Sequence, residues 1–236
     1  MEGYVHSIYS GGMVDGPGIR TIVFLSGCPL RCLYCHNPDS WVKTDGEVKS
    51  VDDVMAEILK YMTFYRTSGG GVTISGGEPF TQPVYMMEVL KACMARGIHT
   101  AIDTSGYAEI EDAERVLPYV DLLLLDIKAF RPQTYKKVTG VEIDKTLALL
   151  ALARDKNKPV WVRYVLVPGL TDDLAEIRGL AEFLRGYPNV QKVDILPFHK
   201  QGEAKWLKRG IAYTLENTPP PSKEVVQVVK EILSLK

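Results

Sequence analysis

Six short runs of apolar and β-branched residues recur along the chain, and each run predicts a β-strand. The runs cover residues 21–25, 72–75, 98–103, 120–127, 160–167 and 190–196. Several of them, such as the stretch DLLLLD at 121–126, are continuously apolar and do not alternate with polar residues. Continuous apolar runs are typical of strands with both faces covered, so the pattern indicates a buried parallel sheet.

Amphipathic stretches between these runs predict helices, and several carry capping residues. Ser50 and Asp53 form a capping pair before the first stretch, and Gly97 closes the second. The predicted helices cover residues 51–66, 82–96 and 172–185, with a buried segment at 147–153 and a last helix at 222–235. Strand, helix and strand in succession predict parallel strands joined by right-handed crossovers.

This order of elements predicts an α/β fold, a partial (βα)6 TIM-like barrel of parallel strands in a single domain. Eight units of about 30 residues would occupy almost the whole chain, whereas six units leave room for both ends. We therefore expect an N-terminal segment at 1–19, the βα core at 20–200, and a C-terminal extension with a helix at 201–236. The functional face is expected at the carboxyl ends of the strands.

Composition and charge narrow the class of protein. The 236 residues are 46% hydrophobic and 24% charged, which is typical of a globular domain and excludes a disordered or collagen-like chain. The net charge of −1 gives no electrostatic reason to expect a nucleic-acid or membrane partner. No apolar run approaches the ~18 residues of a membrane span, and the first residues lack a signal-peptide pattern. A cytoplasmic location is therefore expected.

Three of the four cysteines lie close together in the sequence, as Cys28, Cys32 and Cys35. Thiolates at this spacing can converge on one soft metal centre. One interpretation is a zinc ion bound with His36 in a Cys3His set. The other is a four-iron cluster in which one iron lacks a protein ligand and is open to a substrate. The fourth cysteine, Cys93, falls on a helical face with apolar neighbours, which indicates a packed thiol.

Two sets of motifs carry a resemblance to a known family. The spacing Cys28-x3-Cys32-x2-Cys35, with an aromatic residue before the last cysteine, and the segment SGGEP at 75–79 resemble the radical S-adenosylmethionine (SAM) superfamily. The segments DGPGIR at 15–20 and HNP at 36–38 resemble its glycyl-radical-activating enzymes. Further agreement lies at residues 124–128, 161–164, 167–169 and 196–199.

The resemblance implies an activity and its cofactors. Cys28, Cys32 and Cys35 would hold a 4Fe-4S cluster whose open iron binds SAM, and an electron from the cluster would cleave SAM. The resulting 5′-deoxyadenosyl radical would remove a hydrogen from a glycine of a larger partner enzyme. A one-electron donor such as flavodoxin or ferredoxin and a monomeric state are also expected. The alternatives are an activase of another glycyl radical enzyme and a radical SAM enzyme acting on a small molecule, similar to 7-carboxy-7-deazaguanine synthase.

The resemblance also implies which residues contact SAM. Those residues are Tyr34, Cys35, His36, Gly77, Asp126, Ile127, Lys128 and His199. Glu78, beside two glycines at a strand end, is expected to meet an ammonium group of the ligand. Structural alternatives remain for each group: the glycine pair is also typical of a βα turn, and Asp126 with Lys128 of an internal ion pair.

Charged residues near the strand ends predict three further features. Arg163 lies inside an apolar strand, so it must pair with a ligand or with an internal carboxylate. Asp103, Thr104 and Asp126, together with the carboxylate of SAM, would concentrate negative charge, which predicts a bound cation there, such as a monovalent one. Asp15 precedes the first strand and is expected to accept hydrogen bonds from the partner's glycine loop; a structural turn is the alternative.

Overall fold

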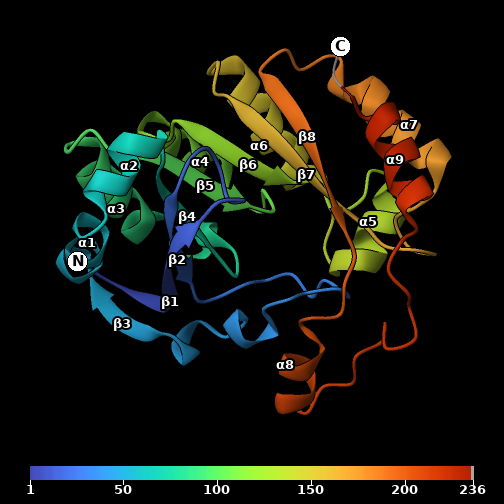
Figure 1. The fold of residues 1–236 in the computed structure, drawn as a ribbon, viewed down its shortest axis with the longest axis horizontal. Coiled ribbons are helices and arrows are strands. Elements are labelled where there is room, and N and C mark those ends of the chain that lie inside the picture. Colours follow the sequence, from blue (N-terminus) through green and yellow to red (C-terminus); the bar gives the residue numbers. More distant parts are fainter. Residues whose placement is uncertain (235–236) are drawn as a thin grey trace.

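The computed structural model describes residues 1–234, and its main feature is one eight-stranded sheet (Figure 1). Six strands run parallel: β2 (Arg20–Leu25), β4 (Gly71–Gly76), β5 (His99–Thr104), β6 (Leu122–Asp126), β7 (Val160–Leu166) and β8 (Val190–Pro197). They coincide with the six predicted runs to within two residues at each end. The predicted fold class, an open and partial α/β barrel, is confirmed.

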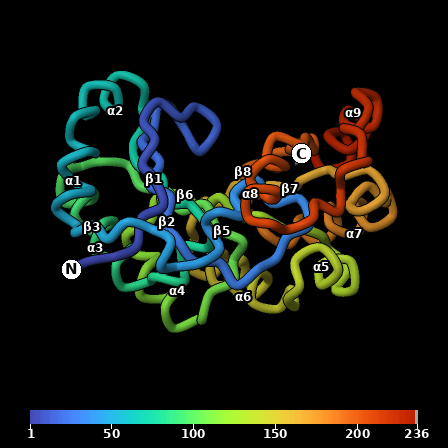
Figure 2. The backbone as a smooth tube through the Cα atoms, turned by 90° about the horizontal axis from the view of Figure 1, so that it is seen from below, coloured from blue at the N-terminus to red at the C-terminus, as the bar shows by residue number. Residues whose placement is uncertain are grey.

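Two strands at one edge of the sheet run antiparallel. β1 (Glu2–Gly12) pairs with β2 and with β3 (Glu47–Ser50), which gives the strand order β3-β1-β2-β4-β5-β6-β7-β8. Neither strand was expected, since the first 19 residues contain no apolar run and β1 is interrupted by glycines and register shifts. Figure 2 shows the β1–β2 hairpin rising from the sheet beside the N-terminal helices.

Nine α-helices connect and cover the strands. They are α1 (Val51–Leu59), α2 (Met62–Ser68), α3 (Pro83–Met94), α4 (Ile110–Val116), α5 (Pro132–Thr139), α6 (Asp144–Asp155), α7 (Leu174–Leu184), α8 (Glu203–Lys208) and α9 (Lys223–Ile232), with 3-10 turns η1 (Pro38–Ser40), η2 (Lys43–Asp45), η3 (Pro79–Thr81) and η4 (Leu117–Tyr119), all within residues 1–234. The capping box of Ser50 and Asp53 opens α1 as predicted.

Three helix predictions differ from the structure in detail. The helix predicted at 51–66 is broken at Lys60 and Tyr61 into α1 and α2. The helix predicted at 172–185 is observed as α7, whose cap is Asp173; the carboxylate of Asp173 accepts from two backbone N–H groups at the start of the helix. The last helix, predicted at 222–235, is observed as α9, and residue 235 lies outside the described part of the chain.

The apolar residues form one main core between the helices and the outer face of the sheet. Val23, Ile74, Ile102, Leu123 and Val162 supply its central strand positions, and all are almost completely buried. Alternate residues of the same strands therefore face the inside of the barrel. There, the apolar set of Ala101, Leu122 and Leu124 gives way to charged residues toward the carboxyl ends.

Cys93 lies in the main core, with its Sγ atom 3.8 Å from the Sδ atom of Met55, which confirms the packed thiol. A second, smaller apolar cluster joins the segment after β2 to the C-terminal extension, and includes Tyr34, Trp41 and Trp206. Among residues 1–234, no helix has both the length and the hydropathy that crossing a membrane requires.

Candidate active site

A cleft of about 490 Å³ opens at the carboxyl ends of the parallel strands. It is lined from every part of the barrel, by the segment after β2 and by the ends of β4, β5, β6, β7 and β8. Most of the predicted site residues line it: Asp15, Cys28, Cys32, Tyr34, Cys35, His36, Gly77, Asp103, Thr104, Asp126, Lys128 and His199. One cleft thus gathers residues that are up to 184 positions apart in the sequence.

Residues 28–35, here called the cysteine loop, are fixed by backbone hydrogen bonds to two neighbouring segments. The N–H groups of Arg31 and Leu33 donate to the last carbonyls of α5, over 2.7 and 3.0 Å. The N–H of Cys28 donates to the carbonyl of Trp41 over 3.0 Å. Because these contacts do not involve the thiols, the loop places three Sγ atoms at the cleft without using them as structural anchors.

The chemistry of the three thiols fits a multi-iron cluster. All three are free, and burial raises the pKa of each, to about 12 for Cys32, because the low-dielectric surroundings disfavour the thiolate. A bound metal offsets this penalty, since thiolate is the form that ligates. Within the described residues, no group of three or more His, Cys, Asp or Glu side chains converges closely enough for a single metal ion. Thiols spread around one cleft suit a cluster, in which each thiolate binds its own iron, better than they suit zinc.

The two glycines after β4 allow the strand to approach the cysteine loop closely. Gly76 has a φ of +127°, and a Cβ atom there would lie 2.2 Å from the carbonyl oxygen of Leu25. A Cβ atom on Gly77 would lie 2.3 Å from the carbonyl oxygen of Gly27 and 3.0 Å from the Cβ atom of Cys28. Side chains at these two positions would therefore push the strand away from the cysteines.

Glu78 and Ile127 do not reach the cleft. The Glu78 side chain is fully buried, and its carboxylate accepts four hydrogen bonds, from Phe80 N, Thr104 Oγ1, Ser105 N and Ser105 Oγ, at 2.5 to 3.1 Å. Burial raises the pKa of Glu78, and these four donors counteract that effect. In this structure Glu78 ties the end of β4 to the end of β5, and its contact with an ammonium group of the ligand stays a prediction. Ile127 is fully buried and packs in the main core.

Lys128 and Asp126 form an ion pair at the end of β6, with Nζ 2.8 Å from Oδ2. Burial lowers the pKa of Lys128, but its charge interactions with Asp126, Tyr34 and Cys32 and its hydrogen bond to Asp126 together outweigh burial and hold the pKa well above the usual value. The Nζ atom also lies 6.0 Å from the ring centroid of Tyr34 in the cysteine loop. The internal ion pair weighed from the sequence is present, and both of its members still line the cleft.

Two histidines stack at the rim of the cleft. The rings of His36 and His199 are stacked with centroids 4.2 Å apart, and His36 Nε2 lies 3.2 Å from the carbonyl oxygen of His199. The contact joins the residue directly after the cysteine loop to the segment after β8. Burial lowers the pKa of His36, so its ring is predominantly neutral at pH 7.

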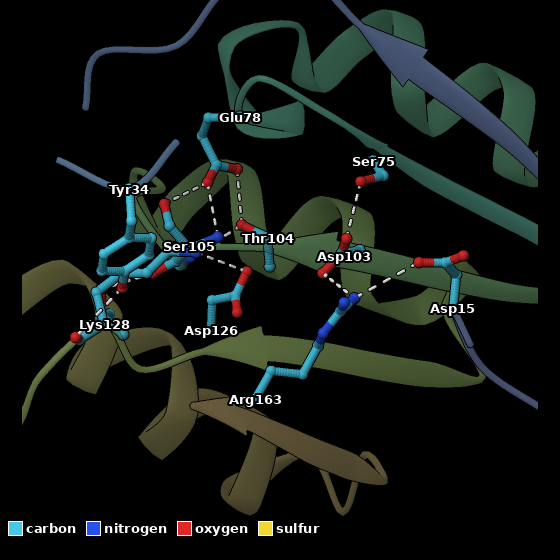
Figure 3. Close-up of polar contacts among 12 residues, drawn as sticks. Asp15, Tyr34, Ser75, Glu78, Asp103, Thr104, Ser105, Asp126, Lys128 and Arg163 are labelled. Atoms are coloured by element: carbon cyan, nitrogen blue, oxygen red, sulfur yellow. Dashed lines mark hydrogen bonds and ion pairs between the residues drawn. The ribbon is translucent and has the colours of Figure 1, made fainter. Parts of the chain in front are cut away.

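Arg163 projects from β7 into the barrel between two carboxylates (Figure 3). Its Nη1 atom lies 3.0 Å from Asp103 Oδ1 and 3.7 Å from Asp15 Oδ1. The Ser75 hydroxyl donates to the other oxygen of Asp103 over 2.8 Å. The structure thus resolves the two alternatives for Arg163 in favour of internal carboxylates.

The same contacts bear on the cation expected beside Asp103, Thr104 and Asp126. Arg163 balances the charge of Asp103, and Lys128 balances that of Asp126. The Thr104 hydroxyl donates to Glu78. Two cationic side chains therefore provide part of the charge balance for which a bound cation was expected, and the cation stays a prediction.

Sequence reasoning missed the residues that hold the cysteine loop from the C-terminal side. Trp206 of α8 donates its indole N–H to the carbonyl of Cys35 over 2.8 Å and packs against Trp41 at a centroid distance of 5.1 Å. A Cβ atom on Gly202 would lie 2.7 Å from the Cα atom of His36. Two tryptophans outside the predicted strands and helices were the available signal, since large aromatic residues in loops need a packing partner.

Comparison with known proteins identifies the family. The profile of the Radical SAM superfamily matches residues 22–184. The chain belongs to the radical SAM superfamily. Within it, the chain is 44% identical to the pyruvate formate-lyase-activating enzyme of Listeria monocytogenes, with 98% of this chain and 96% of the relative covered. It is 42% identical to the pyruvate formate-lyase 1-activating enzyme of Escherichia coli, with 98% of this chain and 95% of the relative covered.

A solved structure agrees with this family. A domain of the pyruvate-formate lyase-activating enzyme from Bacteroides vulgatus is 30% identical and superposes with a TM-score of 0.59, over 70% of this chain and 93% of that domain. As a radical SAM protein of this family, the chain uses a 4Fe-4S cluster and SAM as cofactors. Cys28, Cys32 and Cys35 are the residues whose chemistry and placement fit the cluster.

Proposed function

We propose that this protein activates pyruvate formate-lyase by cleaving SAM reductively and removing a hydrogen atom from a glycine of that enzyme. One observation carries the proposal: three cysteines and Asp15 of the DGPGIR segment line a single cleft, in a chain 42% to 44% identical over nearly its full length to enzymes named for this activation. Residues 39–68 contain no cysteine, so this segment provides no thiol ligand for a second cluster.

Each part of the cleft has a role in this reaction. The cysteine loop holds the cluster, and Tyr34, His36, Gly77, Asp126, Lys128 and His199 surround the space for SAM. When bound, the cluster supplies one electron, and SAM supplies the carbon radical that becomes 5′-deoxyadenosine on taking the hydrogen. Asp15, at the barrel side of the cleft, accepts hydrogen bonds from backbone N–H groups of the glycine loop. Positioning of that loop is essential because the glycine Cα must come within a few ångströms of the reacting carbon.

The open barrel also indicates how the partners are used. The six parallel strands do not close, so an extended loop of a large enzyme has room to enter from the side. The electron comes from a small one-electron carrier, a flavodoxin or ferredoxin, and the protein acts as a monomer in the cytoplasm. These three points belong to the proposal.

The decisive experiment mixes the reconstituted protein with pyruvate formate-lyase, SAM and a strong reductant without oxygen. The expected result is the doublet resonance of a glycyl radical, with one 5′-deoxyadenosine formed per radical. Cys28→Ala should abolish both. Cys93→Ala is the matched control; it should retain both and lower the free energy of unfolding by only ~1 to 2 kcal/mol. SAM cleavage driven by a small metabolite, with no radical on the lyase, would instead favour the small-molecule alternative.

A further inference from the structure

We propose that Arg163 is a positioning residue that couples binding of the glycine loop at Asp15 to binding of SAM at the carboxyl ends of β5 and β6. The inference rests on the proposed function and adds a mechanism to it. One guanidinium group reaches both carboxylates, with Nη1 3.0 Å from Asp103 and 3.7 Å from Asp15. Figure 3 shows Arg163 between them, with Ser75 on the far side of Asp103.

The contact between Arg163 and Asp103 leaves one atom of each side chain without a hydrogen bond. Both side chains are about 85% buried, at 14% and 15% exposure. Neither Arg163 Nη1 nor Asp103 Oδ1 makes a well-aligned hydrogen bond, although the two atoms are an ion pair. Buried charged atoms rarely lack such bonds. We infer that both atoms are set to reorient when ligands arrive, and that they complete their bonding only in the loaded cleft.

The other side of Asp15 is fixed, so its side chain is the part free to respond. The carbonyl oxygen of Asp15 accepts a hydrogen bond of 2.6 Å from Thr73 Oγ1. That same Oγ1 atom accepts from Arg20 Nε, also over 2.6 Å, and Arg20 is fully buried. Close behind, a Cβ atom on Gly18 would lie 2.4 Å from the backbone nitrogen of Gly70. The backbone of the DGPGIR segment is thus held rigidly against β4.

Coupling follows from sharing one guanidinium group between two carboxylates. A loop that donates N–H groups to Asp15 orders that carboxylate and, through it, Arg163 and Asp103. SAM then binds beside a carboxylate that is already ordered, so the free energy of SAM binding no longer includes the entropic cost of ordering it. By thermodynamic linkage, SAM must strengthen binding of the loop by the same factor. Loss of Arg163 would also leave the buried carboxylate of Asp103 without this counter-charge.

The test measures this factor directly. Calorimetry measures binding of SAM to the anaerobic, cluster-loaded protein, with and without a synthetic peptide that carries the radical-glycine segment of pyruvate formate-lyase. Binding of the peptide is measured in the same way, with and without SAM. Reductant is left out, so that no turnover occurs. Saturating peptide should lower the Kd of SAM by about tenfold, within the usual range of coupling between sites, and saturating SAM should lower the Kd of the peptide equally. In Arg163→Gln both ratios should fall below about twofold.

Three variants separate coupling from a purely structural role. Arg163→Lys keeps the charge but not the forked geometry, so it should keep the unfolding midpoint of the apoprotein and lose most of the coupling. Asp15→Asn keeps an acceptor for the loop but not the charge that attracts Arg163. This variant should also lose most of the coupling between peptide and SAM. Arg178→Gln, on the exposed face of α7, should behave as wild type. If Arg163→Gln does not fold, the Lys and Asn variants decide the question.

Two outcomes would overturn the inference, namely a wild-type protein without coupling and Arg163 variants that retain it. Neither outcome touches the proposed function, because glycyl radical formation on the full lyase is measured separately. Conversely, absence of that radical in the wild type would refute the proposed function whatever the coupling between peptide and SAM.

Discussion

The Arg20 side chain is completely buried, and within the described residues the carboxylates of Asp15 and Asp121 act on its charge without forming a salt bridge to it. Its guanidinium donates to the Thr73 hydroxyl, to the carbonyls of Pro17 and Val72, and weakly to that of His99. Burial lowers the pKa of Arg20 to about 10. It therefore remains charged at pH 7, and the backbone carbonyls of β4, β5 and the DGPGIR segment, with the Thr73 hydroxyl, replace its water.

We predict that Arg20→Met lowers the free energy of unfolding of the apoprotein by ~2 to 4 kcal/mol. The variant leaves several buried acceptors without donors, and each carries a desolvation penalty. Urea denaturation followed by circular dichroism measures the change, with Arg178→Met at an exposed position as the control. A loss no larger than that of the control would show that the carbonyls find other donors.

At this scale the sequence predicted which residues meet, but not where each side chain points. Cysteine spacing and strand-end positions were sufficient to place Cys28, Asp126 and Lys128 at one cleft. For Glu78 the sequence did not show that the carboxylate faces the end of the neighbouring strand, because the turn at Gly76 and Gly77 sets its direction toward β5. Arg163 was left undecided for the same reason, since its partners come from β5 and from the segment before β2.

Among the elements, the six-residue helix α8 holds the cysteine loop and the residues that follow it in place. Its Trp206 bonds to the carbonyl of Cys35, and its Lys205 bonds to the side chains of Asn37 and Asp39 just beyond the cysteine loop. The helix is thus a clamp on the segment that carries the cluster ligands. The cysteine loop is thus held by α5 at Arg31 and Leu33 and by α8 at Cys35.

We predict that Trp206→Ala accelerates loss of iron to a chelator by about tenfold, since a hydrogen bond and buried ring contacts worth ~1 to 2 kcal/mol are removed from the loop. Trp206→Phe keeps a ring but no N–H donor, so it should lie between the two. Iron release is followed by absorbance of the chelate. Equal rates in all three proteins would show that α8 does not restrain the cysteine loop.

The sequence predicted the parallel strands well because each is covered on both faces, which leaves an apolar run that needs no partner to be recognised. β1 and β3 were missed because they exist only as partners of β2 and of each other. The break between α1 and α2 was also missed. No glycine or proline marks it, and at the turn Tyr61 packs against the main core.

At the scale of the whole molecule, the protein has two apolar regions, one that stabilises the fold and one that surrounds the cluster site. The main core lies between helices and sheet and contains none of the three cluster cysteines. The smaller cluster, with Trp41 and Trp206, surrounds the cysteine loop. Stability of the fold and integrity of the cluster site therefore rest largely on different contacts.

We predict that protein stripped of iron keeps its far-UV circular dichroism spectrum and a cooperative thermal transition. Only the fluorescence of the tryptophans near the cysteine loop should change, because their surroundings depend on the cluster. A small metal-dependent domain would behave in the opposite way and unfold on chelation. An apoprotein with the spectrum of an unfolded chain would contradict the division into two regions.

The open barrel has a consequence for behaviour in concentrated solution. β8 ends the sheet, so one of its edges offers backbone N–H and C=O groups to any extended chain nearby, including a strand of a second copy. This edge carries features that natural proteins use against such pairing: Lys192 and Asp194 form a partly exposed ion pair, and Pro197 has no N–H to donate. Substituting Lys192 and Asp194 by valine should therefore allow the edge of β8 to pair with strands of other copies, so that the protein aggregates.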